Sequence, residues 1–303
     1  MAASFWKQSI FYIKAMRPYQ WTKNGVVFAA FIFALGDKQQ HLSKASLNHA
    51  LLAAIFFCLM SSAIYLINDI RDRNNDRQHP TKRFRPIAAG TVPLCGASIL
   101  SLSLIILSLT GSYLLNIQLF AVICTYFIMQ LVYTFGLKRV ALVDIFVISA
   151  GFVLRALAGA VVLHVVISPW LLLCTMLLAL FLALCKRRHE KNELGHMPEH
   201  TRASLTQYNV KLLDQLISIV SSAVIVCYAL YTLWPDTVAK YGTSRLGFTI
   251  PFVIFGLFRY LDLVYRHEKG DRPEKILLTD IPLILNLLAY GVTVLAILLI
   301  FRH

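Results

Sequence analysis

The sequence predicts an all-α membrane protein, a polytopic bundle of about nine transmembrane helices with polar loops on one membrane face. Of the 303 residues, 58% are hydrophobic and 15% are charged, and the mean hydropathy is +0.66. Apolar runs long enough to approach bilayer thickness recur along the whole chain. No stretch between them is long enough to fold alone, so we expect one integral-membrane domain over residues 1–303.

The predicted elements begin with a segment at the membrane surface. Met1–Arg17 combines Lys7 and Lys14 with aromatic residues and lacks the apolar core and cleavage site of a signal peptide. It therefore predicts an amphipathic helix, with residues 1–22 at the cytoplasmic interface. Nine apolar runs follow, the first shorter than the others: Gly25–Leu35, Leu47–Ile67, Ile99–Leu115, Leu119–Phe135, Val143–Leu163, Trp170–Cys185, Leu216–Leu233, Leu246–Val264 and Ile276–Phe301.

The net charge of +14 raises the question of nucleic-acid binding, but the distribution of the 29 Lys and Arg residues indicates membrane topology instead. Most lie on the N-terminal segment and the loops after the second, fourth, sixth and eighth runs. Such an excess marks the cytoplasmic side, which places the N-terminus and the long polar loops in the cytoplasm of a bacterial inner-membrane protein. The opposite side holds only Lys38, Lys44, Lys240, Arg245 and Arg302.

The most informative polar stretch follows the second run. Asp69, Asp72 and Asp76 are spaced i, i+3, i+7, so on one helix they would share a face with Asn68 beside them. Carboxylates at a membrane boundary are costly unless a cation lies among them. Mg²⁺ binds through a few carboxylates together with a substrate's phosphates, and nearby cations would hold the outer phosphate oxygens. Three such cations come shortly afterwards: Lys82, Arg83 and Arg85.

A simpler interpretation is a solvated helix end, in which the aspartates pair with Arg71, Arg73 and Arg77. The metal-diphosphate interpretation is preferred for three reasons. The acidic residues share a face, they directly follow a predicted transmembrane helix, and a second basic stretch comes after them.

The same stretch carries a family resemblance. Its pattern is N-D-x-x-D-x-x-x-D from Asn68 to Asp76, then R-P-x-x-x-G from Arg85 to Gly90. It resembles the UbiA superfamily of intramembrane transferases, which are helical bundles whose aspartate-rich loops bind Mg²⁺ and a diphosphate. The resemblance extends to R-P-Y-Q-W-T-K-N at Arg17–Asn24 and Y-T-F-G-L-K-R at Tyr133–Arg139. It implies a single membrane transferase domain.

The loop after the sixth run separates branches of that superfamily. Aromatic prenyltransferases carry a second D-x-x-x-D motif there, whereas this chain has C-K-R-R-H-E-K-N-E at Cys185–Glu193. A mostly basic loop favours direct phosphate binding over a second metal-bound diphosphate. Further motifs closely resemble decaprenyl-phosphate phosphoribosyltransferases; they lie at His79–Gly90, Phe135–Lys138, Val143–Ala150, Leu154–Gly159 and Lys186–Glu190.

This second resemblance implies transfer of 5-phosphoribose from phosphoribosyl diphosphate (PRPP) to a polyprenyl phosphate. Diphosphate is released, and products of that family feed lipid-linked arabinofuranose synthesis for cell-envelope glycans. Asn68, Asp69, Asp72 and Asp76 would then hold Mg²⁺ and the diphosphate. The basic groups Lys82, Arg83 and Arg85 would steady phosphate oxygens. Lys186 and Arg187 would take the donor 5-phosphate or the lipid phosphate, and Glu190 would contact a ribose hydroxyl or orient a cation. Which cation meets which phosphate stays open.

Several polar residues near the ends of the runs carry two interpretations. Lys23 and Asn24 act as an interfacial anchor with Trp21 or as substrate contacts, and the family's opening motif favours contact. Tyr133, Lys138 and Arg139 contact substrate or mark the end of the fourth run. The charged residues within the runs also have alternatives. Asp144 caps its helix or faces the cavity, and Arg155 is functional or binds backbone carbonyls. Arg259 and Asp262 are expected to pair with each other.

Two other constellations have simple explanations. A zinc site from His189, Glu193, His196, Glu199 and His200 is disfavoured because no cysteine lies at a useful spacing. The six cysteines form no C-x-x-C pair and are expected to pack as small apolar side chains.

Two functions of other kinds compete with phosphoribosyl transfer. One is an aromatic prenyltransferase using a prenyl diphosphate, which the missing second acidic motif disfavours. The other is a transporter of a phosphorylated metabolite, which would need polar groups near the membrane midplane and repeated, broken helices. The sequence leaves the prenyl chain length and a homo-oligomeric state open.

Overall fold

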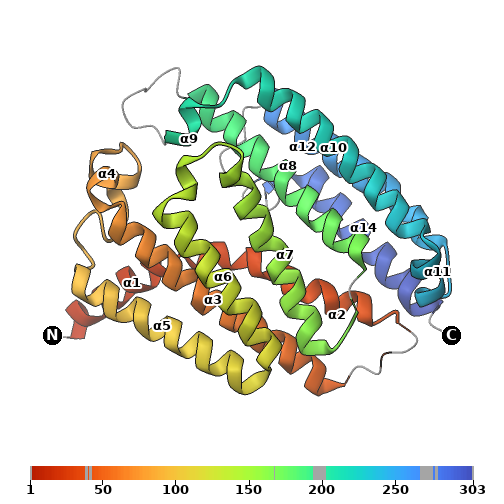
Figure 1. Ribbon diagram of the computed structural model, residues 1–303, viewed down its shortest axis with the longest axis horizontal. Coiled ribbons are helices and arrows are strands. Elements are labelled where there is room, and N and C mark those ends of the chain that lie inside the picture. The colour runs from red at the N-terminus through yellow and green to blue at the C-terminus, as the bar shows by residue number, and fades with distance from the viewer. Residues whose placement is uncertain are drawn as a thin grey trace.

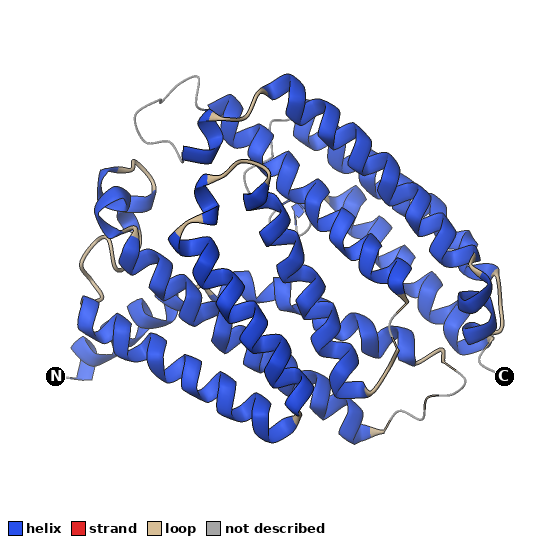
Figure 2. Ribbon diagram, viewed as in Figure 1, coloured by secondary structure: helices blue, strands red, loops and turns tan. Residues whose placement is uncertain are grey.

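The computed structural model describes residues 2–37, 40, 43–166, 168–193, 203–266, 276 and 279–301, and within these ranges every regular element is helical (Figures 1 and 2). Eight helical stretches are long and apolar enough to cross a bilayer, which confirms the membrane-bundle class. They are α3 (Lys44–Arg71), α5 (Leu94–Leu115), α6 (Ile117–Phe135), α7 (Val143–Leu163), α8 (Pro169–Glu193), α10 (Val210–Leu233), η6 with α12 (Arg245–Thr249 and Ile250–Arg266) and α14 (Ile281–Ile300).

The first predicted run differs from a single transmembrane helix, so the count of nine is not confirmed. The chain forms α1 (Ala2–Met16), then the 3₁₀ helix η1 (Pro18–Phe28) and the short helix α2 (Ala29–Ala34). The break begins at Arg17, whose φ of 55° lies in the left-handed region, and Pro18 cannot continue a helix by hydrogen bonding. Gly159 lets the η1 backbone approach α7 closely, since a Cβ there would lie 1.9 Å from the Val27 carbonyl oxygen.

Helix α7 lies at the centre of the bundle and joins its two halves. On one side it packs against η1, α2, α3 and α6, and on the other against α8. Separate hydrophobic clusters fill the two halves, one around Phe57 and Met60 of α3, the other around Phe181 of α8 and Ile217 of α10. Because α7 contributes to both, side chains at its N-terminal end can meet groups from either half.

The short polar elements gather at one end of this bundle. Figure 1 shows α4 (Arg73–Gln78), α9 (Ala203–Thr206) and the turn between α6 and α7 at the same end, toward the upper left. That turn contains η3 (Leu137–Arg139), and η2 (Lys82–Phe84) follows α4. The opposite end holds α2 and α11 (Pro235–Tyr241). The chemistry-bearing residues thus share one end of the molecule.

Candidate active site

The expected single helix through Asp69, Asp72 and Asp76 is interrupted. Helix α3 ends at Arg71, Asp72 adopts φ −87° and ψ 5°, and α4 begins at Arg73. The Asp72 N–H still donates to the Asn68 carbonyl, and the Asp76 N–H donates to the Asp72 carbonyl, so the break is a change of direction between two hydrogen-bonded turns. The three carboxylates therefore do not form one row on one helix face.

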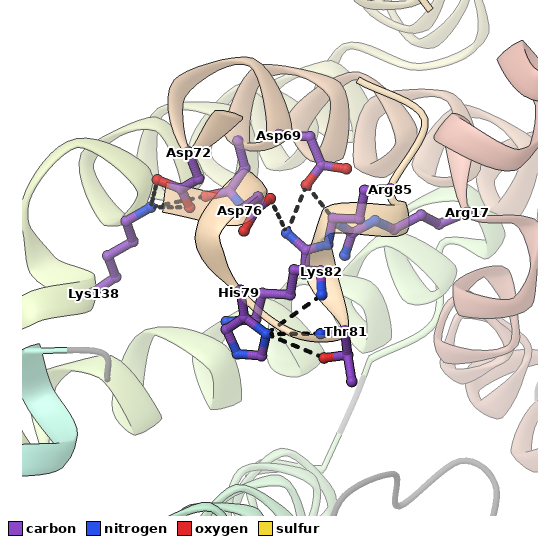
Figure 3. A network of polar contacts seen from close by, with 10 residues as sticks. Arg17, Asp69, Asp72, Asp76, His79, Thr81, Lys82, Arg85 and Lys138 are labelled. Carbon is purple, nitrogen blue, oxygen red and sulfur yellow. Dashed lines mark hydrogen bonds and ion pairs between the residues drawn. The ribbon is translucent and has the colours of Figure 1, made fainter. Parts of the chain in front are cut away.

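Three cations from three separate segments, two of them distant in the sequence, contact these carboxylates (Figure 3). Arg17 Nη2 donates to Asp69 Oδ1 at 2.5 Å, and Arg85 Nη1 contacts both Asp69 Oδ1 at 3.1 Å and Asp76 Oδ2 at 2.7 Å. Asp72 turns away from them, and Lys138 Nζ lies 2.7 Å from each of its carboxylate oxygens. The aspartate cluster, meaning Asp69, Asp72 and Asp76, is thus neutralised by Arg17, Arg85 and Lys138.

Two arginines of the solvated-helix interpretation, Arg71 and Arg77, bind elsewhere. Arg71 donates to the backbone carbonyls of Thr134 and Phe135 at the end of α6, and Arg77 Nε donates to the Ala88 carbonyl at 3.0 Å. The cations that contact the aspartates instead lie in η3 and at the ends of η1 and η2. This convergence of separate segments on buried acids is more typical of a binding site than of a solvated helix end.

The aspartates fit a hard divalent cation by their chemistry, because Asp69 and Asp76 are buried and offer carboxylate oxygens. In this arrangement the position between them is filled by one guanidinium nitrogen of Arg85. Over the described ranges, no three His, Cys, Asp or Glu side chains converge as a ready-made metal group. Burial raises the pKa of the Asp76 carboxyl, and the neighbouring Arg85 opposes that rise.

The Lys138 turn also contacts Asn68, whose Oδ1 accepts from Lys138 Nζ at 3.1 Å. Asn68 and Asp72 therefore share Lys138, whereas Asp69 and Asp76 share Arg85. Arg139 is exposed, and its backbone carbonyl accepts from Gln207 Nε2 at 3.3 Å.

Of the three basic residues predicted after α4, Arg85 forms direct salt bridges with Asp69 and Asp76. Lys82 is half-buried and its charge acts on Asp76. Its N–H lies 3.4 Å from His79 Nδ1. Arg83 is exposed and its guanidinium lies 4.8 Å from the centre of the Phe84 ring. Figure 3 shows Lys82 and His79 on the same side of the cluster as Arg85.

The basic end of α8 forms a second polar group. Arg187 Nε donates to Asp144 Oδ2 at 2.8 Å, and Arg187 Nη1 donates to Glu190 Oε2. The side chains of Arg187 and Asp144 are 3% and 0% exposed, so this pair is buried, contrary to an arginine held out for phosphate. Lys186 Nζ lies 3.9 Å from Glu190 Oε1 and is more exposed. Tyr133 interacts electrostatically with Arg187.

Asn24 makes a hydrogen bond in the interior of the bundle. It is buried, and its Oδ1 accepts from Arg155 Nε at 2.7 Å. Arg155 also donates to the Gly151 carbonyl and to the Tyr126 hydroxyl, at 2.7 and 2.9 Å. The intramembrane arginine is thereby hydrogen-bonded by neutral oxygens and holds η1 against α7. Lys23, next to it, is half-buried in η1.

Arg259 of α12 pairs with two aspartates of the C-terminal half. Arg259 contacts Asp280 through two nitrogens and Asp262 at 3.0 Å, as the mutual-pairing interpretation expects. Of the zinc candidates, His196, Glu199 and His200 lie outside the described residues. The six cysteines are free thiols, two of them buried.

The sequence motifs include Arg17 and Asp144, but no sequence pattern assigns Arg17, Gln207 or Tyr208 to the site. Arg17 lies 52 residues before Asp69, and Tyr208 lies 64 residues after Asp144. Nothing in the local pattern links such distant residues. The only available signal was the family motif that begins at Arg17.

Comparison with known proteins identifies a family over most of the chain. The model of the UbiA prenyltransferase family matches residues 26–288. Decaprenyl-phosphate phosphoribosyltransferase of Mycobacterium tuberculosis is 39% identical over 287 residues, covering 93% of this chain and 92% of the relative. The Corynebacterium glutamicum protein of the same name is 37% identical, covering 88% of this chain and 80% of its own length.

Solved structures share the fold. A UbiA homologue from Archaeoglobus fulgidus, bound to DMAPP and Mg²⁺, superposes with a TM-score of 0.70 at 18% identity. The match covers 95% of this chain and 98% of the homologue. A UbiA homologue from Aeropyrum pernix K1 gives a TM-score of 0.61 at 16% identity, over 92% of this chain and 97% of that one.

Proposed function

The chain belongs to the UbiA prenyltransferase family, and from that premise we propose that it is a Mg²⁺-dependent phosphoribosyltransferase of the membrane. It transfers 5-phosphoribose from PRPP to a polyprenyl phosphate of the decaprenyl type and releases diphosphate. The observation that carries the proposal is the 39% identity, over nearly the whole of both chains, to a protein named for this reaction. The product then serves as a precursor of lipid-linked arabinofuranose.

The aspartate cluster is proposed to receive the donor's diphosphate. Bound Mg²⁺ would be held by Asp69, Asp72 and Asp76 with Asn68, and would neutralise charge on the leaving diphosphate. The cations that now pair with these carboxylates can then turn to phosphate oxygens. Arg85 and Lys138 come from short loop elements, which supports such an exchange. Lys82 and Arg83 would add positive charge at the edge of the site.

In the transfer step, an oxygen of the lipid phosphate forms a bond to C1 of the ribose as the C1–diphosphate bond breaks. The diphosphate leaves with the bonding electron pair. A phosphate monoester is already largely anionic near pH 7, so the acceptor needs no dedicated base. The chain's task is to orient the two phosphates and stabilise the charge that develops between them.

The basic end of α8 is proposed to bind the second phosphate. Lys186 is the more exposed cation there, whereas Arg187 is held by two carboxylates and acts mainly by fixing the local geometry. Glu190 contacts both of these side chains, and its carboxylate is proposed to accept from a ribose hydroxyl. Lys23, Tyr133 and Arg139 are proposed to border the same space.

The proposed site faces the cytoplasm. Support comes from the excess of Lys and Arg on this side, together with the gathering of α4, α9 and η3 at one end of the bundle. PRPP is a water-soluble donor, while the acceptor lies in the bilayer. A site at the membrane boundary allows both to reach it.

Radiolabel transfer tests the proposal. Detergent-purified protein is incubated with labelled PRPP, a polyprenyl phosphate and Mg²⁺, with EDTA in a parallel sample. We expect Mg²⁺-dependent label in the lipid phase. Absence of transfer at several prenyl chain lengths, in folded protein, would contradict the proposal, and label moving from a prenyl diphosphate to an aromatic acceptor would identify the competing activity. Label retained as unmodified solute in proteoliposomes would identify transport.

A further inference from the structure

A short segment after α9 links the two polar groups of the site. Gln207 and Tyr208 lie between α9 and α10 and reach the turn that carries Lys138. Gln207 Oε1 accepts from the Ala141 N–H at 3.2 Å, and its Nε2 donates to the Arg139 carbonyl at 3.3 Å. The Gln207 side chain thus holds the backbone directly after Lys138 at two points.

The Tyr208 hydroxyl makes the more specific contacts. It accepts from the Leu142 N–H at 2.7 Å and donates to Asp144 Oδ1 at 2.7 Å. The other carboxylate oxygen of Asp144 accepts from Arg187 Nε, and Ser204 Oγ lies 3.4 Å from it. One buried hydroxyl therefore bridges the Lys138 turn and the Asp144–Arg187 pair.

The backbone at this bridge is strained. Leu142 has φ 67° and ψ −48°, a region that residues with a Cβ rarely adopt. Such a conformation persists only where the surroundings over-determine it, and it clusters at functional sites. The Tyr208 hydroxyl binds the N–H of this very residue. Losing that bond would remove a restraint on the turn four residues after Lys138.

We infer that Tyr208 is a positioning residue, which fixes the Lys138 turn against the Asp144–Arg187 pair and so sets the spacing of the cations in the site. The inference deepens the proposed function and rests on it for the identity of the substrate. It assigns no contact between Tyr208 and substrate. Its effect on phosphate binding is transmitted through Lys138, with the buried Asp144–Arg187 pair as the fixed support on the other side.

Tyr208→Phe tests this role, because it removes the hydroxyl and keeps the ring. Tyr265→Phe is the matched control, since the Tyr265 hydroxyl also donates to an aspartate of an Asp–Arg pair, Asp214 with Arg188, away from the Lys138 turn. Binding of inorganic diphosphate with Mg²⁺ is measured by calorimetry, together with KM and kcat for PRPP. We expect Tyr208→Phe to weaken diphosphate binding and raise KM roughly tenfold, and Tyr265→Phe to change neither beyond about twofold.

A double-mutant cycle separates positioning from general stability. In a Lys138→Met background, Tyr208→Phe should weaken diphosphate binding by less than about twofold, because the group it positions is gone. Additive losses, or unchanged binding in Tyr208→Phe, would overturn the inference. If Tyr208→Phe does not fold, Gln207→Ala replaces it, since exposed Gln207 holds the same turn; unchanged binding there would overturn the inference too.

The diphosphate-binding measurement also distinguishes the proposed function from the positioning role of Tyr208. Wild-type protein that binds Mg²⁺ with diphosphate but transfers no label from PRPP would defeat the proposed function. The diphosphate affinities of Tyr208→Phe and Tyr265→Phe would then still decide whether Tyr208 positions the cations.

Discussion

The aspartate cluster and the Asp144–Arg187 pair use the same chemical groups at the same end of the bundle, but they are held differently. The cations around the aspartates, Arg17, Arg85 and Lys138, lie in or beside 3₁₀ elements, and their side chains are 15%, 26% and 12% exposed. Asp144 and Arg187 lie on long helices and are almost fully buried. We therefore expect the first group to exchange partners on binding a ligand and the second to act as a fixed support.

The largest effect is expected for Asp72→Asn, which removes one negative charge from the aspartate cluster. Turnover should fall roughly 100- to 1,000-fold, because the leaving diphosphate loses part of its metal-mediated stabilisation. The Asp72 side chain is 26% exposed, so the folding cost should be small. Label transfer and thermal unfolding are measured together.

Asp262→Asn is the matched control for that variant. Asp262 is also an ion-paired aspartate at 27% exposure, but its partners are Arg259 and Arg266. Its turnover should remain within about twofold of wild type. Full activity in Asp72→Asn, or an equal loss in Asp262→Asn, would remove the distinction between the aspartate cluster and an ordinary ion pair.

Breaking the fixed pair should mainly affect stability. Arg187→Met leaves the Asp144 carboxylate buried without its arginine, a change that typically costs about 3–5 kcal/mol. Chemical unfolding in detergent measures the loss. Replacing both residues, as Arg187→Met with Asp144→Leu, should restore part of it, since no uncompensated charge stays buried. An Arg187→Met variant as stable as wild type would show that the Asp144–Arg187 pair does not stabilise the fold.

Lys138→Met tests the exchange directly, with a smaller expected effect. Loss of a charged hydrogen bond to phosphate should raise KM for PRPP roughly 10- to 100-fold and leave thermal stability nearly unchanged. Lys138→Arg should recover part of the affinity because it keeps the charge. An unchanged KM in Lys138→Met would mean that Lys138 only neutralises Asp72.

The smallest effect concerns pH. Burial raises the pKa of Asp76 above the ordinary aspartate value of about 3.9. Folding therefore favours its protonated form, and this contribution to stability is present at acid pH and decreases as the pH rises through the raised pKa. Metal binding should show the opposite dependence, increasing over that same range. In Asp76→Asn, Mg²⁺ affinity should no longer increase with pH over this range, as measured by Mg²⁺ titration between pH 4 and 7.

Sequence patterns predicted the membrane bundle because each apolar run carries its own signal. They also located the aspartates and Arg85, which lie close together in the chain. The shared helix face was wrong because the chain changes direction at Asp72, where no proline or glycine signals a break. The local pattern could not assign Arg17 or the burial of Arg187, since their partners lie 52 and 43 residues away. Tertiary packing decides such pairings.

The most direct measurement is binding of Mn²⁺, as a spectroscopic substitute for Mg²⁺, to the purified protein with and without inorganic diphosphate. Electron paramagnetic resonance reports the bound ion in wild type, Asp72→Asn and Asp262→Asn. The exchange of partners at the aspartate cluster predicts diphosphate-dependent Mn²⁺ binding in wild type and Asp262→Asn, and its loss in Asp72→Asn. Equal binding in all three proteins would contradict the assignment of the metal-diphosphate site to the aspartate cluster.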